Sequence, residues 1–322
     1  MIGTYWEVIG KKGKDGVAWV YLLSSRREGG IFIECVDALD PRYPAKDKWV
    51  IILSSQKGCP VKCCFCDAAF YFRGNLNREE LLEQLEVVMA PHSGGDDCLY
   101  SKKVKLHFAR MGEPAMNPAV LSVLADIPLL YPGVNFIPTI ATVAPAGSEN
   151  WFQELISLKN RLYSEGRFQL QFSINSTDEN FRDRMIPIKK WKAREISHFG
   201  QEYYRSGDRK ITLNYALTLE APFKARNIVE VFDPSVFLIK ITPINPTEEA
   251  NKNGFTTAIN FDGSYQESLR SEIEKLKEAG FEVIISIGSL EEIGVGSNCG
   301  QLAFAAYLQL QKINFGNDNA KH

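Results

Sequence analysis

The sequence predicts an α/β fold: a closed or partly closed barrel of parallel strands joined by crossover helices, with a β-hairpin added before it. Apolar, strand-like stretches recur along the chain, and helical stretches lie between them. A cysteine-rich loop also leaves the end of the first barrel strand, where such barrels collect their chemistry. With 322 residues, 45% of them hydrophobic, the chain can bury a sizeable core.

The first elements are read directly from the sequence. VAWVYLLS (17–24) and GIFIECV (30–36) are β-type stretches and predict the hairpin. WVIILSS (49–55) is an apolar run and predicts the first barrel strand. REELLEQLEVVMA (78–90) places three leucines and a valine on one face, which indicates an amphipathic helix.

The remaining elements continue this alternation and predict a partial (β/α)6 barrel of the TIM type. We expect an N-terminal β extension over 1–47, the barrel over 48–288, and over 289–322 a loop followed by a terminal helix. The further strand-like stretches are 104–110, 135–143, 168–175, 210–218, 236–244 and 281–287, and the helical stretches are 118–126, 148–162, 179–205 and 264–279.

Composition narrows the class of protein. Lys plus Arg (37) nearly balances Asp plus Glu (39), which argues weakly against a dedicated nucleic-acid protein, although a local basic face is compatible with it. No apolar run reaches the roughly eighteen residues of a membrane helix. Seven cysteines are few and odd in number, and no secretory signal opens the sequence, so we expect a cytoplasmic protein without a disulfide framework.

Four of the seven cysteines lie in SSQKGCPVKCCFCDAAF (54–70). Cys59, Cys63 and Cys66 form a C-x3-C-x2-C pattern, with Cys64 wedged beside Cys63. Structural zinc is the main alternative, but the chain offers neither a second cysteine pair nor a suitably spaced pair of histidines. Three thiolates without a fourth suit an iron–sulfur cluster with one open iron. We interpret Cys64 as a small buried hydrophobe.

This cysteine pattern, with Phe65 before its last cysteine, is similar to that of radical S-adenosylmethionine (SAM) enzymes. Over residues from about 17 to 305, the sequence resembles the RlmN/Cfr group of radical-SAM adenine methyl-synthases, which act on ribosomal RNA and, in one branch, on transfer RNA. The other matching motifs follow in order: MGEPAMNP (111–118), FSINSTDENFRDRMIPI (172–188), ITPINP (241–246) and CGQLA (299–303).

The resemblance implies two cofactors, a [4Fe–4S] cluster on Cys59, Cys63 and Cys66, and SAM on its open iron. An electron donor such as flavodoxin or ferredoxin would then drive cleavage of SAM to a 5′-deoxyadenosyl radical, which abstracts hydrogen from its target. The residues that the resemblance and their places after strands assign to SAM are Gly112, Glu113, Thr139, Ser173, Asn175 and Asn245.

These SAM contacts differ in their physical support. A carboxylate at Glu113, after the second barrel strand, can accept charge-assisted hydrogen bonds from the SAM ammonium. Ser173 and Asn175 are two residues apart and are expected to point the same way. Thr139 is equally well explained as a core threonine, and Asn245, which precedes a proline, as a turn residue.

The resemblance also implies a methyl carrier at Cys299. One SAM would methylate this thiolate, and the radical from a second SAM would remove a hydrogen from that methyl group before carbon is transferred to adenine. Glu34 aligns with a glutamate proposed to accept a proton. The plain alternatives are an inert cysteine and an exposed strand glutamate.

Three features depart from the family pattern. Ile52 stands where the family has a second catalytic cysteine, whose thiolate releases the product by forming a disulfide. The chain begins almost at the hairpin, so we expect it to lack the family's N-terminal RNA-binding domain. The stretch EEIGVGSN (291–298) also differs from the family sequence. The candidates to replace the missing thiol are Cys35, Cys64 and Cys98.

We therefore expect a radical SAM enzyme that transfers carbon through Cys299 to an RNA or nucleotide-like substrate. One alternative is a radical SAM enzyme that abstracts hydrogen from a small molecule without a methyl-cysteine. An alternative of a different class is a non-catalytic iron–sulfur binding module, which would have no need of Glu113, Ser173 or Asn245.

Overall fold

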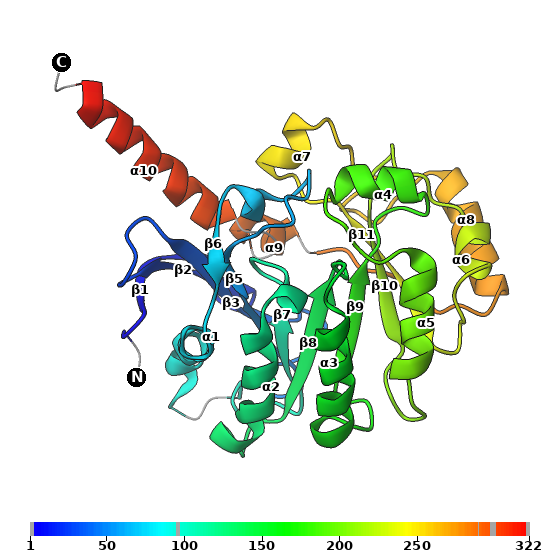
Figure 1. Ribbon diagram of the computed structural model, residues 1–322, viewed down its shortest axis with the longest axis horizontal. Helices are drawn as coiled ribbons and strands as arrows, with labels where there is room; N and C mark the ends of the chain where they lie inside the picture. Colours follow the sequence, from blue (N-terminus) through cyan, green and yellow to red (C-terminus); the bar gives the residue numbers. More distant parts are fainter. Residues whose placement is uncertain (1–2, 95–96, 289, 297–300, 320–322) are drawn as a thin grey trace.

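The computed structural model describes residues 3–94, 97–288, 290–296 and 301–319. Their main feature is one ten-stranded sheet in the order β1-β2-β3-β4-β7-β8-β9-β10-β11-β12 (Figure 1). Strands β4 and β7 to β12 run parallel, whereas β1 to β4 pair antiparallel. The predicted α/β partial barrel is confirmed.

The N-terminal extension belongs to the same sheet as the barrel. The predicted hairpin is present as β2 (Ala18–Ser25) and β3 (Phe32–Leu39), and β3 joins the barrel by pairing with β4. An additional strand, β1 (Trp6–Lys14), precedes the hairpin. Most of its residues are exposed, and from Gly10 onward they are only glycine and lysine, so it lacks the apolar signal that identified the other strands.

The barrel strands lie within a few residues of their predicted positions. Among the described residues, six strands of five to seven residues are followed by a seventh of three, and β5 and β6 form a separate pair beside the cysteine loop. Their bounds are β4 Trp49–Leu53, β5 Gln56–Gly58, β6 Phe72–Asn75, β7 Val104–Phe108, β8 Phe136–Thr142, β9 Gln169–Ser173, β10 Ile211–Leu217, β11 Phe237–Pro243 and β12 Val283–Ile285.

Helices connect these strands. The predicted helix over 179–205 is divided into two, because Pro187 lacks an amide hydrogen and disfavours a helical backbone at Ile186 before it. The helices are α1 Arg78–Met89, α2 Pro118–Leu130, α3 Glu149–Leu162, α4 Glu179–Met185, α5 Ala193–Tyr203, α6 Ala225–Val229, α7 Glu248–Lys252, α8 Glu267–Glu278, α9 Leu290–Val295 and α10 Gln301–Asn319, with short 3-10 helices at Asp67–Ala69, Ala90–His92 and Pro114–Met116.

The two faces of the parallel sheet differ in chemistry. The outer face is apolar and packs against the helices; in β7, for example, Val104, Leu106 and Phe108 are fully buried. The alternate residues of that strand, Lys105 and His107, point to the inner face and are partly exposed. Further polar residues on the inner face are Thr139, Gln169, Gln171, Ser173, Thr212, Asn214, Lys240 and Thr242.

The C-terminal segment covers one side of the inner face. Val295 of α9 and Leu302 of α10 pack in one apolar cluster with Val20, Val36 and Ile52 of the first strands. Beyond this contact, α10 extends away from the barrel (Figure 1). Within the part of the chain that the structure describes, no helix has the length and apolar character needed to cross a membrane.

Candidate active site

The cysteine loop lies at the edge of the sheet where the parallel strands end. It follows β5 and is held by backbone and side-chain contacts from three directions. The Cys59 amide donates to the Tyr71 carbonyl at 3.1 Å, and the Cys64 amide donates to the Met185 carbonyl at 3.0 Å. The Thr247 hydroxyl, at the start of α7, donates to the Phe65 carbonyl at 2.8 Å. These contacts fix the loop without any contribution from the thiols of Cys59, Cys63 and Cys66.

Cys59, Cys63 and Cys66 are brought together by this loop. Their side chains are partly exposed. Burial raises the pKa of Cys59 to about 12 and that of Cys66 to about 11. It also raises the pKa of Cys63 well above its usual value, and the other two thiols add to the increase at Cys63. Ionising all three thiols here costs free energy unless a cation offsets their charge. A bound metal ion or cluster would supply that charge.

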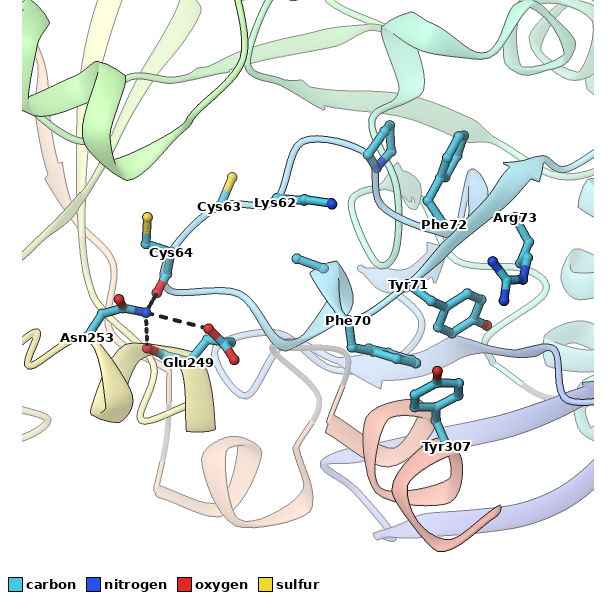
Figure 2. A pocket seen from close by; sticks show the side chains of 12 residues that line it. Lys62, Cys63, Cys64, Phe70, Tyr71, Phe72, Arg73, Glu249, Asn253 and Tyr307 are labelled. Carbon is cyan, nitrogen blue, oxygen red and sulfur yellow. Dashed lines mark hydrogen bonds between the residues drawn. The ribbon is translucent and has the colours of Figure 1, made fainter. Parts of the chain in front are cut away.

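Cys64 has a different environment. Its Sγ donates to the Arg184 carbonyl at 2.9 Å, and its own carbonyl accepts from Asn253 Nδ2 at 2.9 Å (Figure 2). Its thiol is thus already paired with α4. Rather than the buried hydrophobe expected from the sequence, Cys64 is a partly exposed residue with a polar contact.

The three thiols fit an iron–sulfur cluster better than zinc. A structural zinc ion needs four ligands around one point. Among the described residues, no three His, Cys, Asp or Glu side chains converge in that way. In a four-iron cluster each thiolate binds a different iron, so three spaced thiols from one loop suffice and one iron stays open. The donor set and its spacing along the sequence therefore suit such a cluster.

Glu113 lies beside the thiols and is 3% exposed. Its carboxylate accepts hydrogen bonds from the Thr142 hydroxyl at 2.5 Å, the Val143 amide at 2.9 Å and the Ala115 amide at 3.0 Å. Burial raises its pKa to about 7, and these three donors act in the opposite direction. A cationic ligand would favour the ionised form.

Gly112 allows Glu113 to reach this position. Its φ is +98°, in the left-handed region that glycine adopts without strain. A Cβ at this residue would meet Gln56 Cβ at 2.6 Å and Ser55 Oγ at 2.7 Å. The Glu113 amide donates to Gln56 Oε1 at 2.8 Å, so the turn is fixed to β5. We therefore attribute the glycine to backbone packing beneath the site.

Ser173 and Asn175 end up in different roles. Ser173 is the last residue of β9, on the partly exposed inner face. Asn175 lies beyond the strand with φ +63°, so the two-residue alternation of a strand no longer applies to it. Its side chain is 2% exposed, and its Oδ1 accepts from the Ala216 amide at 3.0 Å. Asn175 thus supports the neighbouring strand end.

Thr139 lies in the middle of β8, paired in register with His107, and its hydroxyl is buried. The threonine at the end of that strand is Thr142, which contacts Glu113 and was not singled out from the sequence. To distinguish the two threonines from the sequence, the end of the strand would have to be predicted to within one residue. Asn245 is partly exposed after β11, and its carbonyl accepts from the Thr247 amide at 2.8 Å, as in a turn.

Glu34 is fully buried in β3 and is paired rather than exposed. It accepts from Arg110 Nε at 2.6 Å and from the Ala303 amide, in α10, at 2.6 Å. Arg110 also donates to the Gly296 carbonyl at 2.7 Å. The pair thereby connects the sheet to both sides of the segment that contains Cys299, which itself lies outside the described residues.

The other thiols are remote from these contacts or strongly disfavoured as nucleophiles. Cys35 is completely buried in the main core, where burial raises the pKa of its thiol well above the usual range. Cys98 is also buried there. Ile52 packs with Val295 and Leu302, close in sequence to either side of Cys299. Position 52 thus belongs to the same apolar cluster as described residues on both sides of Cys299 in the sequence.

Comparison with known proteins finds relatives that share the name RlmN. The chain is 25% identical over 275 residues to "Probable dual-specificity RNA methyltransferase RlmN" of Salinispora arenicola, covering 82% of this chain and 66% of the relative. It is 26% identical over 247 residues to "Dual-specificity RNA methyltransferase RlmN" of Anaeromyxobacter dehalogenans, covering 73% and 61%. The chain thus spans about two thirds of the length of these relatives.

A comparison with family models finds no match. Among solved structures, the chain is similar to Streptococcus suis SuiB bound to S-adenosylmethionine, with 12% identity and a TM-score of 0.45 over 73% of this chain and 49% of the other.

The cysteine loop generates a first prediction. Replacing Cys59, Cys63 or Cys66 by Ala removes one thiolate of the set and should abolish cluster formation. Cys64→Ala is the matched control, since its thiol is paired with Arg184. Iron and sulfide per chain, measured after anaerobic reconstitution, report the result. Loss of iron in Cys64→Ala with retention in Cys63→Ala would contradict this assignment.

A second prediction concerns Glu113 in the cluster-free protein. Because its folded-state pKa is about 7 against an ordinary 4.5, the folded state holds this proton more tightly than the unfolded state. The free energy of unfolding should therefore fall as pH rises from about 4.5 to 7, by up to about 3 kcal/mol. In Glu113→Gln this part of the pH dependence should vanish. The free energies of unfolding are obtained from urea titrations at several pH values. If they change equally with pH in the two proteins, the carboxyl is not perturbed.

Proposed function

We propose that the chain, whose relatives are named as RlmN RNA methyltransferases, is a radical SAM enzyme that transfers a methyl-derived carbon to an RNA or nucleotide-like substrate. The observation that carries this proposal is the set of three partly exposed thiols beside the buried Glu113 carboxylate, at the edge where the parallel strands end. Chemistry in such barrels collects at that edge.

In this proposal Cys59, Cys63 and Cys66 hold a [4Fe–4S] cluster, and SAM binds beside it. When bound, the cluster supplies the electron that breaks a carbon–sulfur bond of SAM. Glu113 accepts a hydrogen bond from the SAM ammonium while Thr142 and two backbone amides hold the carboxylate in place. Ser173, at the end of β9, offers a hydroxyl to the same ligand, and Asn245, in the turn after β11, offers its side-chain amide.

Cys299 is proposed as the methyl carrier. Its thiolate takes a methyl group from one SAM, which leaves as S-adenosylhomocysteine. The buried pair of Glu34 and Arg110 supports this role, because it holds Gly296 on one side of Cys299 and Ala303 on the other. Glu34 therefore positions the segment; to accept a proton, as the resemblance implies, it would have to give up its pairing with Arg110.

A pocket of about 730 Å³ beside the cysteine loop is the proposed substrate entrance (Figure 2). Its walls include Cys63, the partly exposed ring of Tyr307, and the exposed groups Lys62, Phe72 and Arg73. Aromatic rings stack on unpaired bases, and cations contact phosphates, in proteins that bind single-stranded RNA. This combination favours RNA or a nucleotide over a small apolar substrate.

Ile52 is the observation that favours a second candidate function. It occupies the place beside the Cys299 segment where the family pattern has a thiol, and an isoleucine cannot form the disulfide that frees a product. Hydrogen abstraction from a small molecule, without a methyl-cysteine, needs no such thiol. A cytoplasmic setting and a reductant such as flavodoxin or ferredoxin are common to both candidates.

The methyl-carrier proposal is tested on Cys299. Protein reduced with dithionite should cleave SAM to 5′-deoxyadenosine, and peptide mass spectrometry should find one added methyl group on Cys299. Cys299→Ala should abolish methyl transfer, because no thiolate remains to receive the group. Cys98→Ala is the control, since that thiol is buried in the core.

Ile52→Cys separates the steps of the reaction. It should change product release more than SAM cleavage, because it restores a thiol beside the Cys299 segment without touching the cysteine loop. If Cys299 is never methylated and Cys299→Ala turns over the substrate normally, hydrogen abstraction becomes the better account. Absence of SAM cleavage by the reconstituted protein would exclude both candidates.

A further inference from the structure

Three basic side chains gather on the inner face of the barrel, away from the cysteine loop. Lys105 and His107 are two residues apart in β7 and point the same way. Lys240 comes from β11, on the far side of the partial barrel, yet its charge acts on both of them. Lys105 is the second residue of its strand, so the cluster lies towards the end of the barrel where the strands begin.

This cluster has no compensating charge of its own. Among the described residues, neither lysine makes a hydrogen bond or ion pair with a side chain. Burial lowers the pKa of Lys105 to about 7, and repulsion by Lys240 adds to this effect. Burial is also the main cause of the lowered pKa values of Lys240 and His107.

The surroundings add positive charge. Repulsion by Lys48 lowers the pKa of both lysines. Arg209 adds to this effect at Lys105, and Arg42 adds to it at Lys240. Asp40 is the one acid among the main influences on Lys105, and its carboxylate is already taken by Arg42 at 2.8 Å and Lys48 at 2.6 Å. Basic groups therefore outnumber acidic ones among the main influences on the cluster.

Buried polar atoms without partners lie on the same face. His107 Nε2, Thr139 Oγ1 and Asn214 Oδ1 make no hydrogen bond among the described residues. Thr139 is in register with His107 on the neighbouring strand, and Asn214 is in register with Lys240. Buried polar groups are normally paired, so a ligand that both accepts and donates hydrogen bonds would satisfy this set.

We propose that Lys105, His107 and Lys240 form a binding site for a small phosphate-type oxyanion inside the barrel, between the candidate active site and the end where the strands begin. Its oxygens accept from the two ammonium groups and from His107, and a phosphate hydroxyl donates to Asn214. Chloride lacks that donor. The side chains lie inside the barrel and are only partly exposed, which suits a small anion better than an RNA strand.

Calorimetric titration of the full-length protein with inorganic phosphate, at constant ionic strength in chloride buffer, tests the proposal. We expect saturable binding to one site. Lys105→Met and Lys240→Met each remove a charge-assisted contact worth about 1.5–3 kcal/mol, so each should weaken binding by a factor of about ten or more. Lys12→Met, on the exposed strand β1, is the matched control and should bind as wild type.

Thermal unfolding gives a second readout. Without phosphate, both variants should be at least as stable as wild type, because one of two repelling charges is gone. Phosphate should raise the melting temperature of wild type and of Lys12→Met but not of the two variants. Methyl phosphate serves as a parallel ligand; tighter binding than inorganic phosphate would indicate a phosphorylated small molecule.

A variant with Cys59, Cys63 and Cys66 all replaced by Ala keeps this test independent of the proposed enzymatic function. It should bind phosphate as wild type does, and loss of binding would place the anion at the cysteine loop and overturn the proposal. Unsaturable binding to wild type, or unchanged affinity in both lysine variants, would also overturn it. So would binding of a short RNA oligonucleotide without any binding of inorganic phosphate.

Discussion

The alternation of side chains along the parallel strands is the constraint on which the rest of this structure depends. One face of each strand must be apolar, because helices cover it; the residues between are then free to be polar. In β7, Val104, Leu106 and Phe108 are buried on the outer face, and Lys105 and His107 point to the inner face. A shift of one residue in any strand would place charge in the helical layer, so the register is strongly specified.

A buried ion pair adds a second, local constraint. Glu34 and Arg110 come from β3 and from the loop after β7, and together they hold the chain on both sides of Cys299. Losing one partner would leave an uncompensated buried charge, which costs several kcal/mol. The C-terminal segment is therefore fixed to the sheet by charge at this point and by apolar packing around Ile52. Both contacts join residues that are far apart in the sequence.

The elements that could be predicted from the sequence are those that local residue patterns encode. Apolar periodicity located the barrel strands and most helices, and cysteine spacing singled out the loop. Prediction from the sequence missed β1, most of whose residues are exposed, and could not place Thr142 rather than Thr139 at a strand end. It also placed Cys64 in the interior and gave an exposed strand residue as the alternative to a catalytic Glu34, because their partners, Arg184 and Arg110, are remote in sequence. Contacts of that kind are decided by tertiary structure alone.

The two ends of the barrel have opposite electrostatic character. Where the strands end, three clustered thiols and the Glu113 carboxylate disfavour negative charge, as their raised pKa values show, so this end suits cationic ligands. Towards the end where the strands begin, burial and neighbouring cations lower the pKa values of Lys105 and Lys240, so this region suits anions. In both places the empty protein disfavours the ionised forms of these side chains, and a ligand of opposite charge favours them. Ligand binding at either end should therefore raise the stability of the whole sheet, because both groups are carried on the same strands.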